Sequence, residues 1–190
     1  MSTPLFLGAF IATALLAYLI VAVTAYRRMR GVRIIVCPET DQPAAIAIDA
    51  GGAALSAILE KPDITVARCS RWPERESCNQ ACTAQVAVAP KETLALSIAR
   101  RWFAGQTCAL CLGPIPMLSA HGAPPGLLDC SLQRPPDTVA WNDVPAESLP
   151  ALFETHLPVC ARCHEREHFG VPILRKPAQV EMLLDGDRGK

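Results

Sequence analysis

Four of the nine cysteines in this chain form two Cys-x-x-Cys pairs. One pair consists of Cys108 and Cys111, and the other of Cys160 and Cys163. A short turn between two such cysteines presents both thiolates to one ion, and two distant pairs complete the tetrahedral arrangement that Zn²⁺ prefers. The spacing therefore predicts a metal site that joins two distant segments of the chain.

The residues beside each pair predict how it is held. The first pair comes after a helix stop at Gly105 and before Gly113-Pro114, which is typical of a tight turn. Just before the second pair, Pro158 favours the first turn of a helix, which we expect over about residues 159–169.

The predicted arrangement has one cysteine pair on a turn and the other at the start of a helix. Over about residues 108–169 only, it resembles the treble-clef and zinc-ribbon modules. The resemblance implies a four-cysteine site that holds the fold together around zinc. Many of those modules have glycine directly after the second cysteine of the turn, whereas this chain has Leu112 there and Gly113 one residue later. The long segment between the pairs is a second difference, and we recognise no family that covers the whole chain.

The second pair also fits a different cofactor, because Cys160-Ala161-Arg162-Cys163-His164 matches the attachment motif of c-type haem. Two thioether bonds would hold the porphyrin, and His164 would bind the iron from one side. The other side would be filled by one of four residues: Met117, Met182, His156 or His168. This alternative is a membrane-anchored electron-transfer protein. His164 and His168 also stand one helical turn apart, so either can replace a cysteine in a mixed Cys/His site.

A second candidate site, without a Cys-x-x-Cys pair, consists of Cys37, Cys69, Cys78 and Cys82. Predicted strands lead to Cys37 and Cys69, while Cys78 and Cys82 share one face if their segment is helical. We expect the four to bind Zn²⁺ or an iron–sulfur cluster, since both take thiolates. The alternative is that they are small buried apolar residues. Cys130, in a Pro/Gly-rich loop, is expected to be the unpaired thiol.

The elements that carry these cysteines indicate an α+β fold. We expect three strands, whose apolar residues alternate or are β-branched: Val32–Cys37, Ala44–Asp49 and Ile64–Ala67. We expect helices at three further places: Ala53–Glu60, Lys91–Ala104 and Ala146–His156. Residues 171–190 are expected to form a loosely ordered tail with a short strand near Val180.

An uncharged, apolar segment precedes all of the cysteines. Leu5 to Tyr26 matches the roughly 20 apolar residues that a transmembrane helix needs. Basic residues follow this segment, whereas a cleaved signal peptide carries them in front, so we expect a retained anchor. By the positive-inside rule, the following arginines place the rest of the chain on the cytoplasmic side of the inner (plasma) membrane: Arg27, Arg28, Arg30 and Arg33. That compartment is reducing, which favours metal ligation over disulfides.

The predicted organisation has four parts: an anchor (1–26), a first cysteine-containing subdomain (27–90), a zinc-ribbon-like subdomain (91–170) and a tail (171–190). Equal numbers of basic and acidic residues, 18 of each, argue against nucleic-acid binding. The sequence has no Walker-type or G-x-S-x-G motif. We therefore expect a non-enzymatic, single-pass membrane protein that binds Zn²⁺ or an iron–sulfur cluster through cysteine thiolates and acts in interaction, sensing or assembly with a protein partner.

Overall fold

The computed structural model describes residues 3–57, 63–72, 74, 77–130 and 138–168. These residues combine helices with two small antiparallel sheets, which confirms the α+β class. The chain divides into two compact units, of which the first ends at Ser97 and the second begins at Ile98. The four-part organisation expected from the sequence stays a prediction, and its tail lies outside the described residues.

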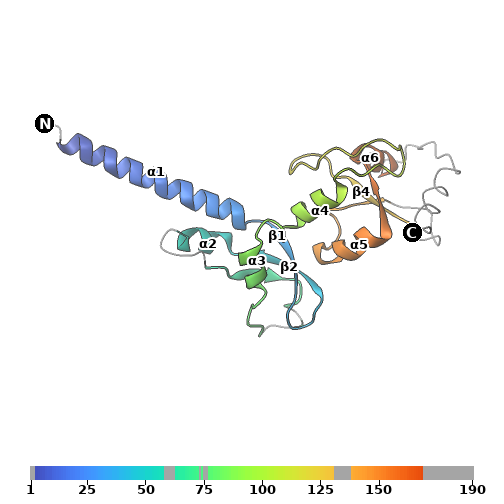
Figure 1. Ribbon diagram of the computed structural model, residues 1–190, viewed down its shortest axis with the longest axis horizontal. Helices are drawn as coiled ribbons and strands as arrows, with labels where there is room; N and C mark the ends of the chain where they lie inside the picture. Colours follow the sequence, from blue (N-terminus) through green and yellow to red (C-terminus); the bar gives the residue numbers. More distant parts are fainter. Residues whose placement is uncertain (1–2, 58–62, 73, 75–76, 131–137, 169–190) are drawn as a thin grey trace. The chain divides into compact units, whose positions relative to one another are not determined.

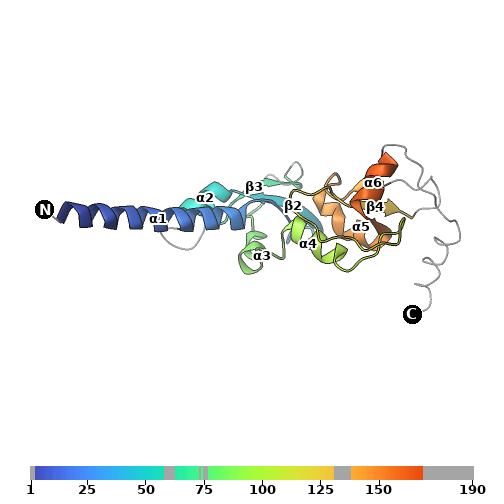
Figure 2. The same cartoon turned by 90° about the horizontal axis from the view of Figure 1, so that it is seen from above.

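The first described element is one long helix, α1 (Thr3–Met29). Within it, Phe6–Met29 has a mean hydropathy of 2.5 and is long and apolar enough to cross a membrane. Its large side chains are exposed, Phe6 and Phe10 at 71% each. Such a surface is more stable in lipid than in water. Figures 1 and 2 show α1 as one uninterrupted helix, and it is a candidate membrane span.

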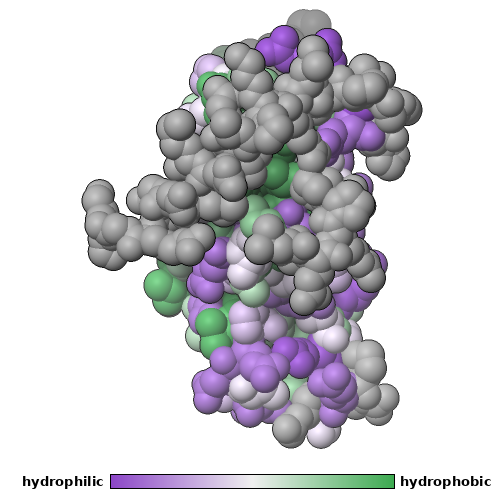
Figure 3. All heavy atoms as spheres, turned by 90° about the vertical axis from the view of Figure 1, so that its right-hand side faces the viewer, coloured by the Kyte–Doolittle hydropathy of each residue, from purple (hydrophilic) through white to green (hydrophobic). Residues whose placement is uncertain are grey.

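The surface shown in Figure 3 is mixed in character. Among the coloured residues on this face, hydrophilic and intermediate side chains lie beside scattered hydrophobic ones. Scattered exposed apolar residues are normal on a protein in water. The contrast with α1 supports a division between an apolar helix and a small soluble domain.

The first unit contains a three-stranded antiparallel sheet. Its strands lie in the order β1-β2-β3: β1 (Val32–Val36), β2 (Pro43–Ile48) and β3 (Val66–Cys69). These strands confirm the three that were predicted, with the third shifted by two residues so that it includes Cys69. Cys37 follows β1 directly, and its backbone N–H donates to the carbonyl oxygen of Gln42 at 2.9 Å, which closes the turn into β2.

A short helix, α2 (Ala50–Ser56), follows β2. The Asp49 carboxylate caps it by accepting hydrogen bonds from the backbone N–H groups of Gly51 and Gly52. This cap places the start of the helix three residues before the predicted start at Ala53, and the predicted end lies outside the described residues. The core of the unit consists of small and β-branched side chains, including Ala44, Ile46, Ile48, Ala53, Val66 and Val86.

Arg33 is fully buried in β1. Its guanidinium donates hydrogen bonds to the carbonyl oxygen of Pro90 and to the hydroxyl of Thr93. Burial, and then the nearby positive charge of Arg28, lower the pKa of Arg33. Arg33 therefore supports the fold, whereas the sequence alone placed it among the arginines that set the orientation in the membrane.

The helix considered for Ser70–Cys82 is absent from the described part of that segment. Residues 77–82 have neither helix nor strand, and α3 (Thr83–Val88) begins only after Cys82. The side chain of Asn79 accepts a hydrogen bond from the N–H of Ala81, and Gln80 has a left-handed φ of 55°. Both features interrupt a helix. The expectation that Cys78 and Cys82 share one helical face is therefore wrong.

The clearest predicted helix is present but shorter, as α4 (Ala95–Phe103). Its first predicted residues form turns instead, because Leu94 pairs with Arg33 in an isolated β-bridge. Gly105 has a φ of 74°, which confirms the predicted left-handed stop. In the second unit, the ring of Trp102 stacks on that of Phe153 with centroids 4.4 Å apart.

The second unit contains a further three-stranded antiparallel sheet, in the order β5-β4-β6: β4 (Gly126–Asp129), β5 (Thr138–Ala140) and β6 (His156–Val159). The sequence analysis predicted none of these strands, since they are short and lie beside proline-rich segments. The predicted helix at 146–156 is confirmed as a 3-10 turn (Ala146–Ser148) followed by α5 (Leu149–Thr155).

The last described helix, α6 (Ala161–His168), begins later than predicted. Pro158 does not open it, because Pro158 and Val159 belong to β6 and Pro158 pairs with Leu127. Proline is tolerated there since β6 is an edge strand. Cys160 therefore lies between a strand and a helix, and Cys163 lies in the first turn of α6.

Candidate metal centre

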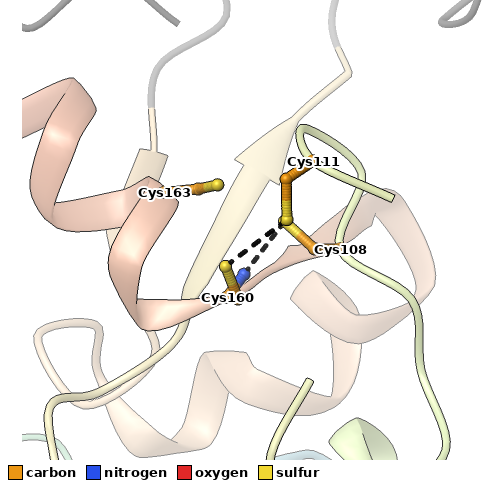
Figure 4. A group of neighbouring side chains, drawn as sticks. All are labelled: Cys108, Cys111, Cys160 and Cys163. Carbon is orange, nitrogen blue, oxygen red and sulfur yellow. Dashed lines mark hydrogen bonds between the residues drawn. The ribbon is translucent and has the colours of Figure 1, made fainter. Parts of the chain in front are cut away.

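The four cysteines of the two Cys-x-x-Cys pairs lie together in the second unit. Figure 4 shows their side chains pointing toward one another, two from the turn after α4 and two from the junction of β6 with α6. The Sγ atoms of Cys108, Cys111, Cys160 and Cys163 all lie within 4.8 Å of one another. Those of Cys111 and Cys160 are 3.8 Å apart. A tetrahedral site with Zn–S bonds near 2.3 Å requires sulfur atoms about 3.8 Å apart, so this cluster has the dimensions of a four-thiolate metal site.

Backbone hydrogen bonds form the turn that carries the first pair. The N–H of Cys108 donates to the carbonyl oxygen of Gly113, and the N–H of Leu112 donates to that of Cys108, both at 2.9 Å. Leu112 has a φ of 59°, the left-handed conformation that glycine adopts most readily. The turn is thus formed in spite of the leucine, which occupies the position where the zinc-binding modules that the sequence resembles often have glycine.

Two backbone hydrogen bonds join the turn to the second pair. The N–H of Ala109 donates to the carbonyl oxygen of Pro158 at 2.9 Å. The N–H of Cys160 donates to the Sγ atom of Cys108 at 3.2 Å. After Cys160, the N–H groups of Cys163 and His164 both donate to its carbonyl oxygen and start α6. The segments that carry the two pairs are therefore joined directly, by one backbone hydrogen bond and by one from the Cys160 N–H to the Cys108 sulfur.

The four thiols differ in how far they are buried. Cys108, Cys160 and Cys163 are buried, whereas Cys111 is exposed. Burial raises the pKa of Cys160 and that of Cys163. Burial also opposes ionisation of Cys108, but hydrogen bonds from backbone N–H groups, first that of Cys160, bring the pKa of this thiol below its usual value. A bound cation is the means by which buried thiols of this kind are held as thiolates.

Among the described side chains, the cluster consists of cysteines, whereas the sequence also offered His164 and His168 as ligands. The Nδ1 atom of His164 lies 3.0 Å from the hydroxyl oxygen of Thr138, in β5. The ring of His164 also lies against Gly126, where an added Cβ would come within 3.0 Å of two ring atoms. No pattern in the sequence signalled these two contacts. The side chain of His168 lies outside the described part of the chain.

Four of the five remaining cysteines share one cavity in the first unit. Cys37, Cys69, Cys78 and Cys82 all line it. Burial, followed by the charges of the three neighbouring cysteines, raises the pKa of Cys82, and Cys82 is the most buried of the four. Their sulfur atoms are not among the closely spaced ligand groups found in the described residues. Cys130 belongs to neither set, and its Sγ atom lies 3.6 Å from the carbonyl oxygen of Leu128.

Comparisons with protein-family models, with curated proteins and with solved structures found no match. This agrees with the sequence analysis, in which a resemblance to zinc-binding modules covered only residues 108–169. The geometry of the cysteine cluster and the character of α1 are therefore what indicate a function. The cluster can bind a metal ion, and α1 can anchor the chain in a membrane.

Proposed function

We propose that this chain is a single-pass membrane protein that binds Zn²⁺ at Cys108, Cys111, Cys160 and Cys163. The mutual spacing of the four sulfur atoms carries this proposal, because all lie within 4.8 Å of one another, and one pair is 3.8 Å apart, close enough to share one zinc ion. An ion placed among them would link the turn after α4 to the start of α6. Its contribution would be to hold the second unit together.

The role of the site is structural and not catalytic. Four protein thiolates fill the coordination sphere of Zn²⁺ and leave no position for a substrate or a water molecule. Zinc sites that do chemistry keep one position open. We infer that the metal-bound unit acts in interaction, sensing or assembly at the membrane, with a protein as its partner.

An iron–sulfur cluster and a haem fit the geometry less well. In a cluster, inorganic iron and sulfide stand between the cysteine sulfurs, whereas these sulfurs are close enough to share one ion. For haem, Cys160 and Cys163 would have to face a porphyrin, but their sulfur atoms face Cys108 and Cys111 instead. Both sulfurs are also buried, which leaves little access for a macrocycle.

We infer that the metal site lies on the cytoplasmic side of the inner (plasma) membrane. Arg27, Arg28 and Arg30 are exposed directly after the apolar segment of α1. The positive-inside rule assigns this end of the helix to the cytoplasm, where thiols stay reduced. A reporter fused after residue 190 should be active when it is of a type that works only in the cytoplasm, and inactive when it requires export.

Metal analysis of the full chain tests the proposed function. Protein purified in detergent without oxygen should be colourless and contain zinc in a fixed ratio to polypeptide. A brown protein containing iron and sulfide, or a red one with a Soret band that survives acid–acetone extraction, would overturn the zinc assignment. Replacement of Cys108 by Ser should remove the zinc of this site, while Cys130→Ser should retain it.

A further inference from the structure

The first unit has a cysteine cluster of its own. We propose that Cys37, Cys69, Cys78 and Cys82 form a second site, which binds one thiophilic divalent ion such as Zn²⁺ and tightens around it. This inference goes beyond the proposed function, since it concerns a different unit and does not require the first site to exist. It rests on where the fold brings these four residues.

Three separate parts of the first unit deliver the cysteines. Cys37 follows β1, and Cys69 ends β3. Cys82 directly precedes α3, and Cys78 lies four residues before it in the segment without regular structure. Cys82 is part of the hydrophobic core, and both Cys37 and Cys69 pack against that core. An ion held by all four would fix the start of α3 to the ends of two strands.

The cavity between them is small. Its volume is about 30 Å³, and Ala44 and Trp72 contribute apolar walls beside the four cysteines. A space of about 10–15 Å³ is enough for one water molecule, so this cavity can receive a single small ion.

Donors to sulfur accompany the cavity. The N–H of Arg71 lies 3.5 Å from the Sγ atom of Cys69, two residues earlier in the chain. The hydroxyl of Thr40, three residues after Cys37, is buried beside the Cys37 thiol. Side chains of both charges are present, because Arg71 and Glu39 line the cavity and the Arg71 guanidinium lies 3.6 Å from the Glu74 carboxylate. The donors to sulfur are therefore what favours bound thiolates here.

The two clusters differ in how far they are preformed. The sulfur atoms of the second unit already lie within 4.8 Å of one another, and those of the first unit do not meet that condition. Binding in the first unit must therefore draw the segment before α3 inward, and this rearrangement reduces the net affinity. We expect this site to load last and to release its ion first, so that it responds to metal supply.

A titration of the full chain tests this proposal. Metal-free, reduced protein in detergent is titrated with Co²⁺, whose thiolate complexes absorb in the near ultraviolet. The wild-type chain should take up about two ions in two phases. Cys37→Ser and Cys78→Ser should each lose the weaker phase and keep the tighter one, while Cys108→Ser should lose the tighter phase. The matched control, Cys130→Ser, should keep both.

The outcomes separate the two sites. If Cys37→Ser and Cys78→Ser both retain the wild-type stoichiometry, the second site does not exist, whatever happens at Cys108. The wild-type chain could instead bind Co²⁺ in a single phase. If Cys108→Ser keeps that phase and Cys37→Ser loses it, the proposed function is refuted and this inference is supported. Should a variant fail to fold, alkylation of the Co²⁺-loaded wild-type chain tests the site instead. If Cys37 and Cys78 resist alkylation until a chelator removes the metal, the second site is supported. If both are alkylated rapidly while metal is present, the proposal is overturned.

Discussion

The backbone N–H of Cys160 donates a hydrogen bond to the Sγ atom of Cys108 across 3.2 Å. This bond joins two motifs that are far apart in the sequence, and it belongs to a cluster in which each cysteine pair depends on the other. An N–H group directed at sulfur favours the charged form of the thiol. The cluster is thus arranged to hold a cation, and its loss should affect the whole second unit.

Replacement of Cys163 by Ser should destabilise the second unit by about 3 kcal/mol or more, since a buried ligand is lost and the ion with it. Hydrogen exchange of peptides from β4 and α6 would report the change, with faster exchange expected in the variant. Cys130→Ser is the control and should change stability by no more than about 1 kcal/mol. If these peptides exchange hydrogen as slowly in Cys163→Ser as in the wild-type chain, the cluster does not stabilise the fold.

Leu112→Gly should stabilise the turn of the first pair. Leu112 has a left-handed φ of 59° and is 44% exposed, so glycine relieves strain and removes little packing. The left-handed conformation costs a non-glycine residue roughly 1–2 kcal/mol, and the greater chain entropy of glycine offsets about half of that gain. Thermal unfolding should show a higher midpoint for Leu112→Gly than for Leu112→Ala, which keeps the strain. A lower midpoint for glycine would contradict this reading of the turn.

Gly126→Ala should destabilise the second unit by about 1–3 kcal/mol, because the new Cβ would come too close to the His164 ring. His164→Ala should remove most of this penalty, since the obstructing ring is gone. A double-mutant cycle followed by chemical denaturation measures the coupling between the two positions. Purely additive effects would mean that the contact in the structure has no energetic consequence.

Arg33→Met should destabilise the first unit by about 2–4 kcal/mol, because it leaves the buried carbonyl oxygen of Pro90 without its donor. Arg30 is exposed, and Arg30→Met serves as the matched control, with an expected change within about 0.5 kcal/mol. Equal effects of the two substitutions on denaturant unfolding would refute the structural role of Arg33. Membrane orientation should be unaffected by Arg33→Met, since this arginine is buried.

The features that sequence analysis recovered are those with strong local signals. The two Cys-x-x-Cys pairs identified the cluster, and apolar character alone identified α1. Asp49 caps a helix through its side chain, and Gly105 ends a helix through its left-handed backbone. Only the glycine stop was predicted. A capping carboxylate is harder to recognise, because aspartate is also common in turns.

The features that were missed depend on contacts between distant residues. β4, β5 and β6 have only a few residues each, and pairing across the sheet determines them more than their own propensity. Pro158 favoured a helix start locally but lies in an edge strand that pairs with Leu127. The segment before Cys82 had helical cysteine spacing, but Asn79 and the left-handed Gln80 interrupt it.

Native mass spectrometry of the intact full chain, combined with alkylation under native conditions, tests the central claim most directly. The chain should carry the mass of bound zinc, and Cys108, Cys111, Cys160 and Cys163 should resist alkylation until a chelator removes the metal. The result that contradicts the account is a bare polypeptide of unmodified mass in which all four of these sulfurs are alkylated at once.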